Sequence, residues 1–152
     1  MRPTVAMMLL FGFLSLPSLA LADNGLVTKK SAYGVPETLD RLEKILQTKG
    51  LTIFARIDHT AGAQKVEQTL RPTQVLIFGN PKMGTPLMAS QQTIGIDLPM
   101  KALVWEDGEG QVWLAYNRPQ YLADRHGVNN EAVIGKMTNA LNGLTDKATQ
   151  RE

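Results

Sequence analysis

Apolar residues recur first at helical spacing and then at strand spacing between residues 35 and 58. In the first part of this segment they lie three or four positions apart, which is the period of one face of an α-helix. These positions are Val35, Leu39, Leu42 and Leu46. Pro36 suits the first turn of this helix, and Gly50 suits its end. From residue 51 to residue 58 apolar residues alternate, so a β-strand is predicted to follow.

A β-hairpin is indicated farther along the chain. Residues 102–106 and 112–116 are strand-like apolar runs, and the short segment between them contains Gly108 and Gly110. Glycine permits the positive φ angles of a tight reversal, so the two runs are expected to pair. Shorter apolar runs predict two further strands, at residues 25–32 and 73–78.

The C-terminal part of the chain predicts a second long helix, which starts after the N-cap residue Asn130. Its apolar stripe consists of Val133, Ile134, Met137, Leu141 and Leu144. A shorter helix is expected at residues 119–125, and Gly127 is placed to end it. The polar residues after Thr145 are expected to fray.

These elements follow the order strand, helix, four strands, helix. Antiparallel strands with both long helices on one face make a two-layer α+β domain. The other sheet face is also apolar, because the strand at residues 73–78 ends in four consecutive apolar residues. A broad exposed apolar face usually marks an interface, which predicts a homodimer. Alternatively, residues 60–70 and 90–99 fold over this face within one chain.

Residues 1–22 are typical of a secretory signal peptide. Arg2 precedes an apolar run at residues 5–14, and Ala20-Leu21-Ala22 fits the small-x-small cleavage pattern. We therefore expect residues 23–152 to form a single mature domain that is periplasmic or secreted, with no membrane attachment after cleavage. A membrane anchor is the alternative, but the segment from residue 5 to residue 22 includes Ser15, Pro17 and Ser18 and is near the lower length limit for a span.

Composition excludes several classes of protein. The chain carries 16 Lys and Arg against 14 Asp and Glu, so it lacks the strongly basic surface that nucleic-acid binding needs. It has no Cys, which rules out disulfides and thiol chemistry. Neither Ser31 nor Ser90 lies in a nucleophile elbow, so a hydrolase is not favoured. Nothing in the sequence indicates a cofactor.

Five short motifs follow one another between residues 26 and 144. They are Arg56-Ile57-Asp58-His59, Leu70-Arg71-Pro72-Thr73, Phe78-Gly79-Asn80-Pro81-Lys82 with Gly84-Thr85-Pro86-Leu87-Met88, Asp97-Leu98-Pro99, and Trp105-Glu106-Asp107. Together they resemble the DUF302 family, a group of small domains of unknown function. The resemblance implies a β-α-β4-α fold similar to half of the TATA-binding protein, and pairing into dimers. It implies no reaction, substrate or cofactor.

The segment from Phe78 to Met88 is the best candidate for a binding surface, because two glycines, two prolines, an Asn and a Lys follow a strand there. Thr85 resembles an N-cap with Pro86 at the first helical position. Backbone N–H groups of that helix start, beside Lys82, would bind a small anion. Alternatively, the segment is only a tight connection with Lys82 solvated. The predicted ligand-binding residues are Arg56, His59, Asn80, Lys82, Gly84 and Thr85.

His59 ends a predicted strand and is a weaker candidate for a general base. Its orienting carboxylate would come from Asp97, Glu106 or Asp107. These three acids and His59 are also the candidates for a metal site, although their spacing matches no metal motif. Three irregularly spaced methionines, Met83, Met88 and Met100, favour packing over a copper site. A non-enzymatic binding domain is therefore favoured over an enzyme that uses His59, and over a structural dimerisation module.

Overall fold

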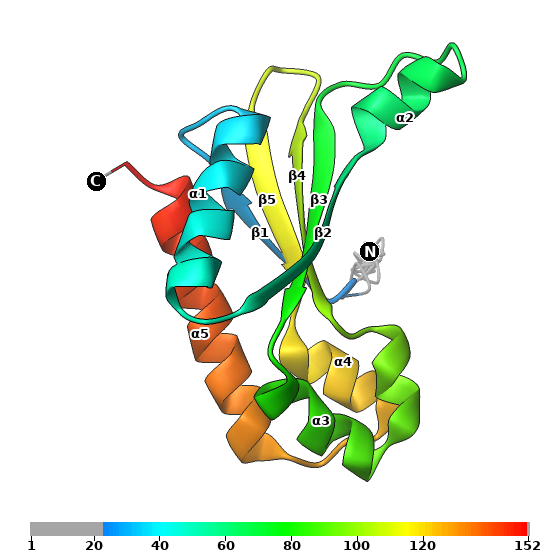
Figure 1. Cartoon of the computed structure of the whole chain (residues 1–152), viewed down its shortest axis with the longest axis vertical. Helices are drawn as coiled ribbons and strands as arrows, with labels where there is room; N and C mark the ends of the chain where they lie inside the picture. The colour runs from blue at the N-terminus through cyan, green and yellow to red at the C-terminus, as the bar shows by residue number, and fades with distance from the viewer. Residues whose placement is uncertain (1–22, 152) are drawn as a thin grey trace, which may run out of the picture.

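The computed structural model describes residues 23–151 and contains one antiparallel five-stranded sheet (Figure 1). Its strand order is β1 (Leu26–Lys30), β5 (Val112–Asn117), β4 (Met100–Glu106), β3 (Thr73–Gly79) and β2 (Thr52–Asp58). The β4–β5 pair is the predicted hairpin, with Glu106 opposite Val112 and Gly110 at a φ of 78° in the turn. The predicted signal peptide lies outside the described residues.

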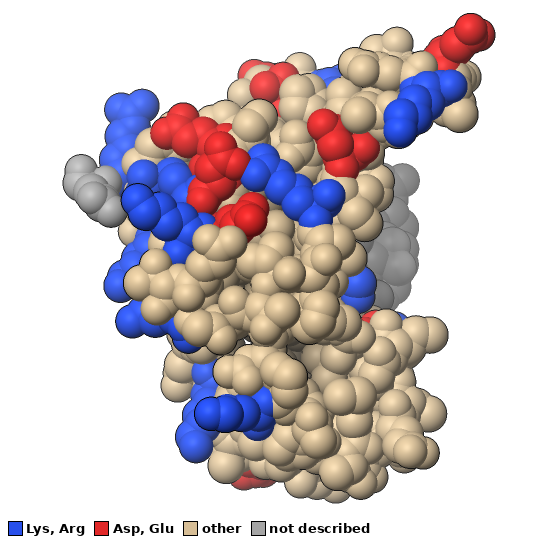
Figure 2. Space-filling view, in the orientation of Figure 1, with Lys and Arg blue, Asp and Glu red and all other residues tan. Residues whose placement is uncertain are grey.

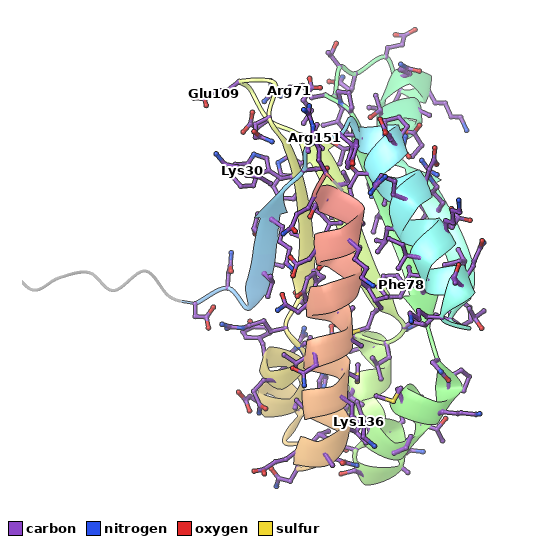
Figure 3. The ribbon with its side chains drawn as sticks, turned by 90° about the vertical axis from the view of Figure 1, so that its left-hand side faces the viewer. Lys30, Arg71, Phe78, Glu109, Lys136 and Arg151 are labelled. Carbon is purple, nitrogen blue, oxygen red and sulfur yellow. The ribbon has the colours of Figure 1, made fainter. Side chains whose placement is uncertain are left out.

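Two long helices, α1 (Val35–Thr48) and α5 (Glu131–Thr149), cover one face of the sheet (Figures 1 and 3). The predicted stripe of α1 is buried there, with Leu39, Leu42 and Leu46 at 0% exposure. It packs against buried strand residues, among them Leu76, Ala102 and Leu114. The two-layer α+β fold with helices on one sheet face is confirmed.

The C-terminal end of α5 differs from the prediction. The helix continues to Thr149, and Thr145, Ala148 and Thr149 are buried, so the expected fraying after Thr145 is wrong. The hydroxyl of Thr145 donates to the carbonyl of Leu141, and that of Thr149 donates to the carbonyl of Thr145. These hydrogen bonds to the helix backbone satisfy the hydroxyl groups, so polar threonine residues can be buried here.

Within residues 23–151, four shorter helical segments occur between the main elements. They are α2 (His59–Lys65), α3 (Pro81–Ser90), the 3₁₀ segment η1 (Gln92–Ile96) and α4 (Pro119–His126). Helix α4 was predicted, and it ends at Gly127, whose φ is 67°. Helix α2 projects beyond one end of the sheet, whereas α3, η1 and α4 gather at the other end (Figure 1).

The second face of the sheet carries apolar side chains. Val75, Leu103 and Ala115 are register partners on this face, and Trp105 lies opposite Trp113. Val75 and Ala115 are buried by their neighbours, but Ile57 at the sheet edge is 43% exposed. The segments expected as an intrachain cover form α2 and η1, which lie toward the two ends of the sheet (Figure 1).

Candidate functional site

The junction between β3 and α3 is built by Asn80 and Pro81. The side-chain oxygen of Asn80 accepts a hydrogen bond from the backbone N–H of Lys82 at 2.9 Å. The backbone carbonyl of Asn80 accepts hydrogen bonds from the backbone N–H groups of Met83 and Gly84 at 2.9 and 3.0 Å. Asn80 is therefore the N-cap and Pro81 the first helical residue. No N–H of residues 82–84 remains free for an anion.

The predicted helix start at Thr85 is consequently wrong. Thr85 lies inside α3, and Pro86 is an internal proline of that helix. The pairs Asn80-Pro81 and Thr85-Pro86 carry the same N-cap signal, and the helix begins at the earlier one, directly after β3 ends. Lys82 stays exposed in the first turn of α3.

Arg56 and His59 are not brought to this junction. Arg56 lies four residues along β2 from Thr52, which pairs with Gly79, so about 13 Å of strand separates the two places. Its guanidinium donates to Asp40 on α1, to Gln74 Oε1 at 3.0 Å and to a carbonyl of α1. His59 is exposed at the start of α2, beyond the far end of β2.

The four candidate metal and acid–base residues are also spread over the molecule. Asp107 lies in the hairpin turn and accepts from Trp113 Nε1 at 2.7 Å and from the backbone N–H of Glu109 and Gln111 at 2.9 Å. These hydrogen bonds, that of Trp113 first, lower the pKa of Asp107 below 3.8. Asp97 follows η1 at the opposite end of the sheet. Among residues 23–151, no group of three His, Asp or Glu is arranged to hold a metal ion.

Asp97 pairs instead with His126, a residue that the sequence analysis did not single out. His126 Nε2 lies 2.7 Å from Asp97 Oδ2, and Nδ1 lies 3.0 Å from Thr93 Oγ1. The side chains of His126 and Asp97 are only 9% and 14% exposed. This pair joins the end of α4 to η1, and it lines neither of the cavities described below.

An apolar groove of about 500 Å³ lies beside α5. Its floor is formed by the end of β3, including Phe78, which lies between α5 and α1 in Figure 3. Asn80 and Met83 of the β3–α3 junction close one side, and small residues on α5, Ala140 and Gly143, leave the space open. The predicted segment thus borders a groove of the size used for small ligands.

Three lysines line this groove. Lys49 lies at the end of α1, and Lys136 and Lys147 lie on α5. All three are exposed, and none has a side-chain hydrogen bond or ion pair with another residue in the range 23–151. The lining contains no Asp or Glu. Lys and Arg gather along the left-hand edge in Figure 2, over α1 and α5, whereas opposite charges alternate above them.

A second cavity, of about 330 Å³, adjoins the groove and shares part of its lining. It is lined by residues that include Phe54, Gly84, Thr85, Met88 and Leu98. Phe54 is the extra residue of a β-bulge in β2 and is 54% exposed. This lining contains no charged side chain.

Sequence reasoning missed the groove lysines because they come from separate elements. A local signal did exist on α5, where Lys136, Ala140, Gly143 and Lys147 are spaced four, three and four residues apart. That spacing places two lysines on one helix face with small residues between them. Their position opposite Lys49 depends on how α5 packs beside α1, which is a tertiary feature.

Comparisons with known proteins identify the family and the fold. The model of a family described as Domain of unknown function DUF302 matches residues 27–144. The crystal structure of the uncharacterized conserved protein DUF302 from Bacillus stearothermophilus superposes with a TM-score of 0.73 at 20% sequence identity. That likeness covers 83% of this chain and 99% of the other.

Two Brucella proteins are more similar in sequence. The Brucella suis protein named fluoride-specific ion channel FluC 1 is 43% identical over 134 residues, which is 87% of this chain and 53% of that protein. The Brucella melitensis protein named FluC 2 has the same identity, over 50% of its length. The chain therefore spans about half the length of these relatives. Within residues 23–151, no helix is long and apolar enough to cross a membrane.

Proposed function

The chain belongs to the DUF302 family, and we propose that it is a non-enzymatic domain that binds a small organic anion in the groove beside α5. This proposal rests on three lysines, Lys49, Lys136 and Lys147, that have no side-chain partner among residues 23–151 and that surround an apolar hollow with no acidic residue in its lining. Repulsion between like charges is relieved when an anion binds among them. An apolar body of the ligand fills the hollow at the same time.

Two amides add polar contacts at the same place. Asn80 uses its side-chain oxygen to cap α3, which leaves its NH₂ group as a donor, and Asn139 lines the groove from α5. The proposed anion site therefore keeps the predicted loop residue Asn80 but replaces Lys82 and Arg56 with the groove lysines. Gly84 and Thr85 belong to the adjoining cavity.

Binding is favoured over catalysis by the chemistry of the groove. Apart from its three lysines, the lining contains no carboxylate, imidazole, hydroxyl or thiol group that could assist them as an acid–base or nucleophilic partner. His59 is exposed and distant, and no described carboxylate forms a hydrogen bond with it. An enzyme that uses His59 is therefore not part of this proposal.

Fluorescence of 8-anilinonaphthalene-1-sulfonate tests the proposed site, because this probe joins an apolar ring system to one negative charge. Replacement of both lysines on α5, Lys136→Gln with Lys147→Gln, is expected to weaken binding about tenfold, since each exposed charge contact contributes roughly 0.2–1 kcal/mol. The uncharged analogue N-phenyl-1-naphthylamine is expected to bind both proteins equally. Lys44→Gln, an exposed lysine elsewhere on α1, is the matched control.

Equal binding of the anionic probe to the wild type and the double variant would contradict the proposal. Sodium fluoride is included as a competitor because the Brucella relatives carry fluoride in their names. Displacement of the probe by fluoride, but not by chloride at the same ionic strength, would overturn the assignment to an organic anion.

We further propose that the protein is exported, with cleavage after Ala22, and that two copies pair through the second sheet face. The dimer follows from the breadth of the apolar face that carries Leu103 and Trp105, which a symmetric partner would cover. Ile57→Asp is expected to halve the mass measured by light scattering without unfolding the chain, because Ile57 is already 43% exposed in the single chain. A wild type with the mass of one chain would refute the dimer.

A further inference from the structure

We propose that the groove and the adjoining cavity form one divided binding site, and that its ligand is a linear aliphatic carboxylate. This inference rests on the proposed function, because the carboxylate would occupy the anion site among the groove lysines. The aliphatic chain would continue past α3 into the second cavity. The site would thus select ligands by the length of an unbranched chain.

The two cavities share a common wall. Five residues line both of them: Gly79, Asn80, Met83, Met100 and Met137. Their volumes, about 500 and 330 Å³, each lie in the range used for small ligands. A ligand that crosses this wall would therefore have space on both sides of it.

Methionine side chains make this wall movable. Met83 is half-buried, and Met100 and Met137 are 5% and 8% exposed. Methionine is unbranched and has three rotatable bonds, so it changes rotamer at lower steric cost than Leu, Ile or Phe. Gly79 contributes no side chain to the wall. A thin alkyl chain can pass between such side chains, whereas a fused ring system would require the backbone to move.

The two cavities differ in charge, which orients the ligand. Lys49, Lys136 and Lys147 line only the groove, and the second cavity is bordered by uncharged residues that include Phe54, Met88 and Leu98. An anionic head is favoured in the first cavity, and an uncharged tail is favoured in the second. Phe54 is 54% exposed, so a tail that reaches it would cover apolar surface now facing water.

Each cavity is lined by a glycine, so a Gly→Leu substitution can fill one cavity with a side chain and leave the other open. A Cβ atom at Gly84 would lie 3.7 Å from Leu98 Cδ1 and 3.8 Å from Met88 Cε, which is ordinary van der Waals contact. A Cβ atom at Gly143 would meet nothing within 4 Å. Gly84→Leu therefore occupies the second cavity, and Gly143→Leu occupies the groove. Met88→Phe is a second way to fill the second cavity if Gly84→Leu does not fold.

The experiment is a calorimetric titration of the mature protein with octanoate, decanoate and dodecanoate. A fully buried methylene strengthens binding about fourfold, and dodecanoate has four more methylenes than octanoate, so it is expected to bind the wild type roughly two-hundredfold more tightly. Gly84→Leu is expected to reduce this gain to less than tenfold, because its side chain fills the second cavity. Gly143→Leu is expected to abolish binding of all three carboxylates.

The outcomes separate this inference from the proposed function. Binding of octanoate that does not strengthen with chain length would overturn the joined site but leave the anion groove intact. A chain-length gain that survives both Gly84→Leu and Met88→Phe would also overturn it. Absence of binding for every carboxylate and for the naphthalene sulfonate probe would overturn both proposals.

Discussion

Two regions that contact helix α1 use their charged residues in opposite ways. Near the N-terminal half of the helix, Arg56 on β2 contacts Asp40 and Gln74. At the C-terminal end, Lys49 lines an apolar groove together with Lys136 and Lys147, and none of these lysines has a side-chain partner among the described residues. We refer to the first region as the paired region and to the second as the groove.

This difference separates charges that serve folding from charges that are available for binding. In the paired region the positive charge of Arg56 is compensated by acidic side chains on α1, so little electrostatic potential remains to attract a ligand. In the groove, three like charges lie beside apolar surface, and their mutual repulsion opposes the stability of the free protein. Sequence patterns alone assigned Arg56 to ligand binding, although its contacts belong to the paired region.

The largest expected effect concerns α1 itself, because both regions depend on it. Leu46→Ala removes a fully buried side chain from the centre of the core and is expected to lower the free energy of unfolding by about 2–5 kcal/mol. Urea unfolding measures this loss. The neighbouring exposed residue supplies the control, since Gln47→Ala should change stability by less than about 0.5 kcal/mol. A loss below 1 kcal/mol for Leu46→Ala would mean that α1 is not anchored as described.

A smaller effect is expected in the paired region. Arg56→Ala removes contacts with Asp40, Gln74 and a carbonyl of α1, and should lower the free energy of unfolding by about 1 kcal/mol because the pair is partly exposed. The affinity for the naphthalene sulfonate probe should not change. A tenfold loss of affinity with unchanged stability would transfer the anion site to Arg56 and invert the comparison.

The smallest effect is a pH-dependent one at Asp107. Its hydrogen bonds with Trp113 and the turn backbone lower its pKa below 3.8, so they stabilise the fold above that value and lose this contribution as the pH falls through the folded-state pKa. Asp107→Asn should therefore lower the melting temperature by a few degrees at pH 7 and by less below pH 4. A difference that grows on acidification would contradict this assignment.

The fold could be predicted where local signals agreed with each other. The α1 stripe at Leu39, Leu42 and Leu46, the β4–β5 hairpin and the Asn130 cap of α5 each combine the right period with the right terminal residue. The start of α3 could not be predicted, because two N-cap and proline pairs occur five residues apart. Helix-capping propensity does not distinguish the two pairs. The helix begins at the earlier pair because β3 ends directly before it.

The candidate site could be predicted from the sequence only in part. Its loop was found because Gly79 and Asn80 interrupt an apolar run, and both residues line the groove and the adjoining cavity. Lys49 and Lys147 were not found because α1 and α5 are separated by most of the chain and meet only after folding. The hydrogen bond between His126 and Asp97 is likewise a contact between distant segments.

The most direct test of the account is a ¹H–¹⁵N NMR titration of the mature protein with octanoate. We expect the largest changes in amide chemical shift around the groove, at Gly79, Asn80 and Gly143. Little change is expected at Arg56 in the paired region and at His59 at the start of α2. A titration in which the amides of Arg56 and His59 shift most would contradict the central claim that the groove lysines form the binding site.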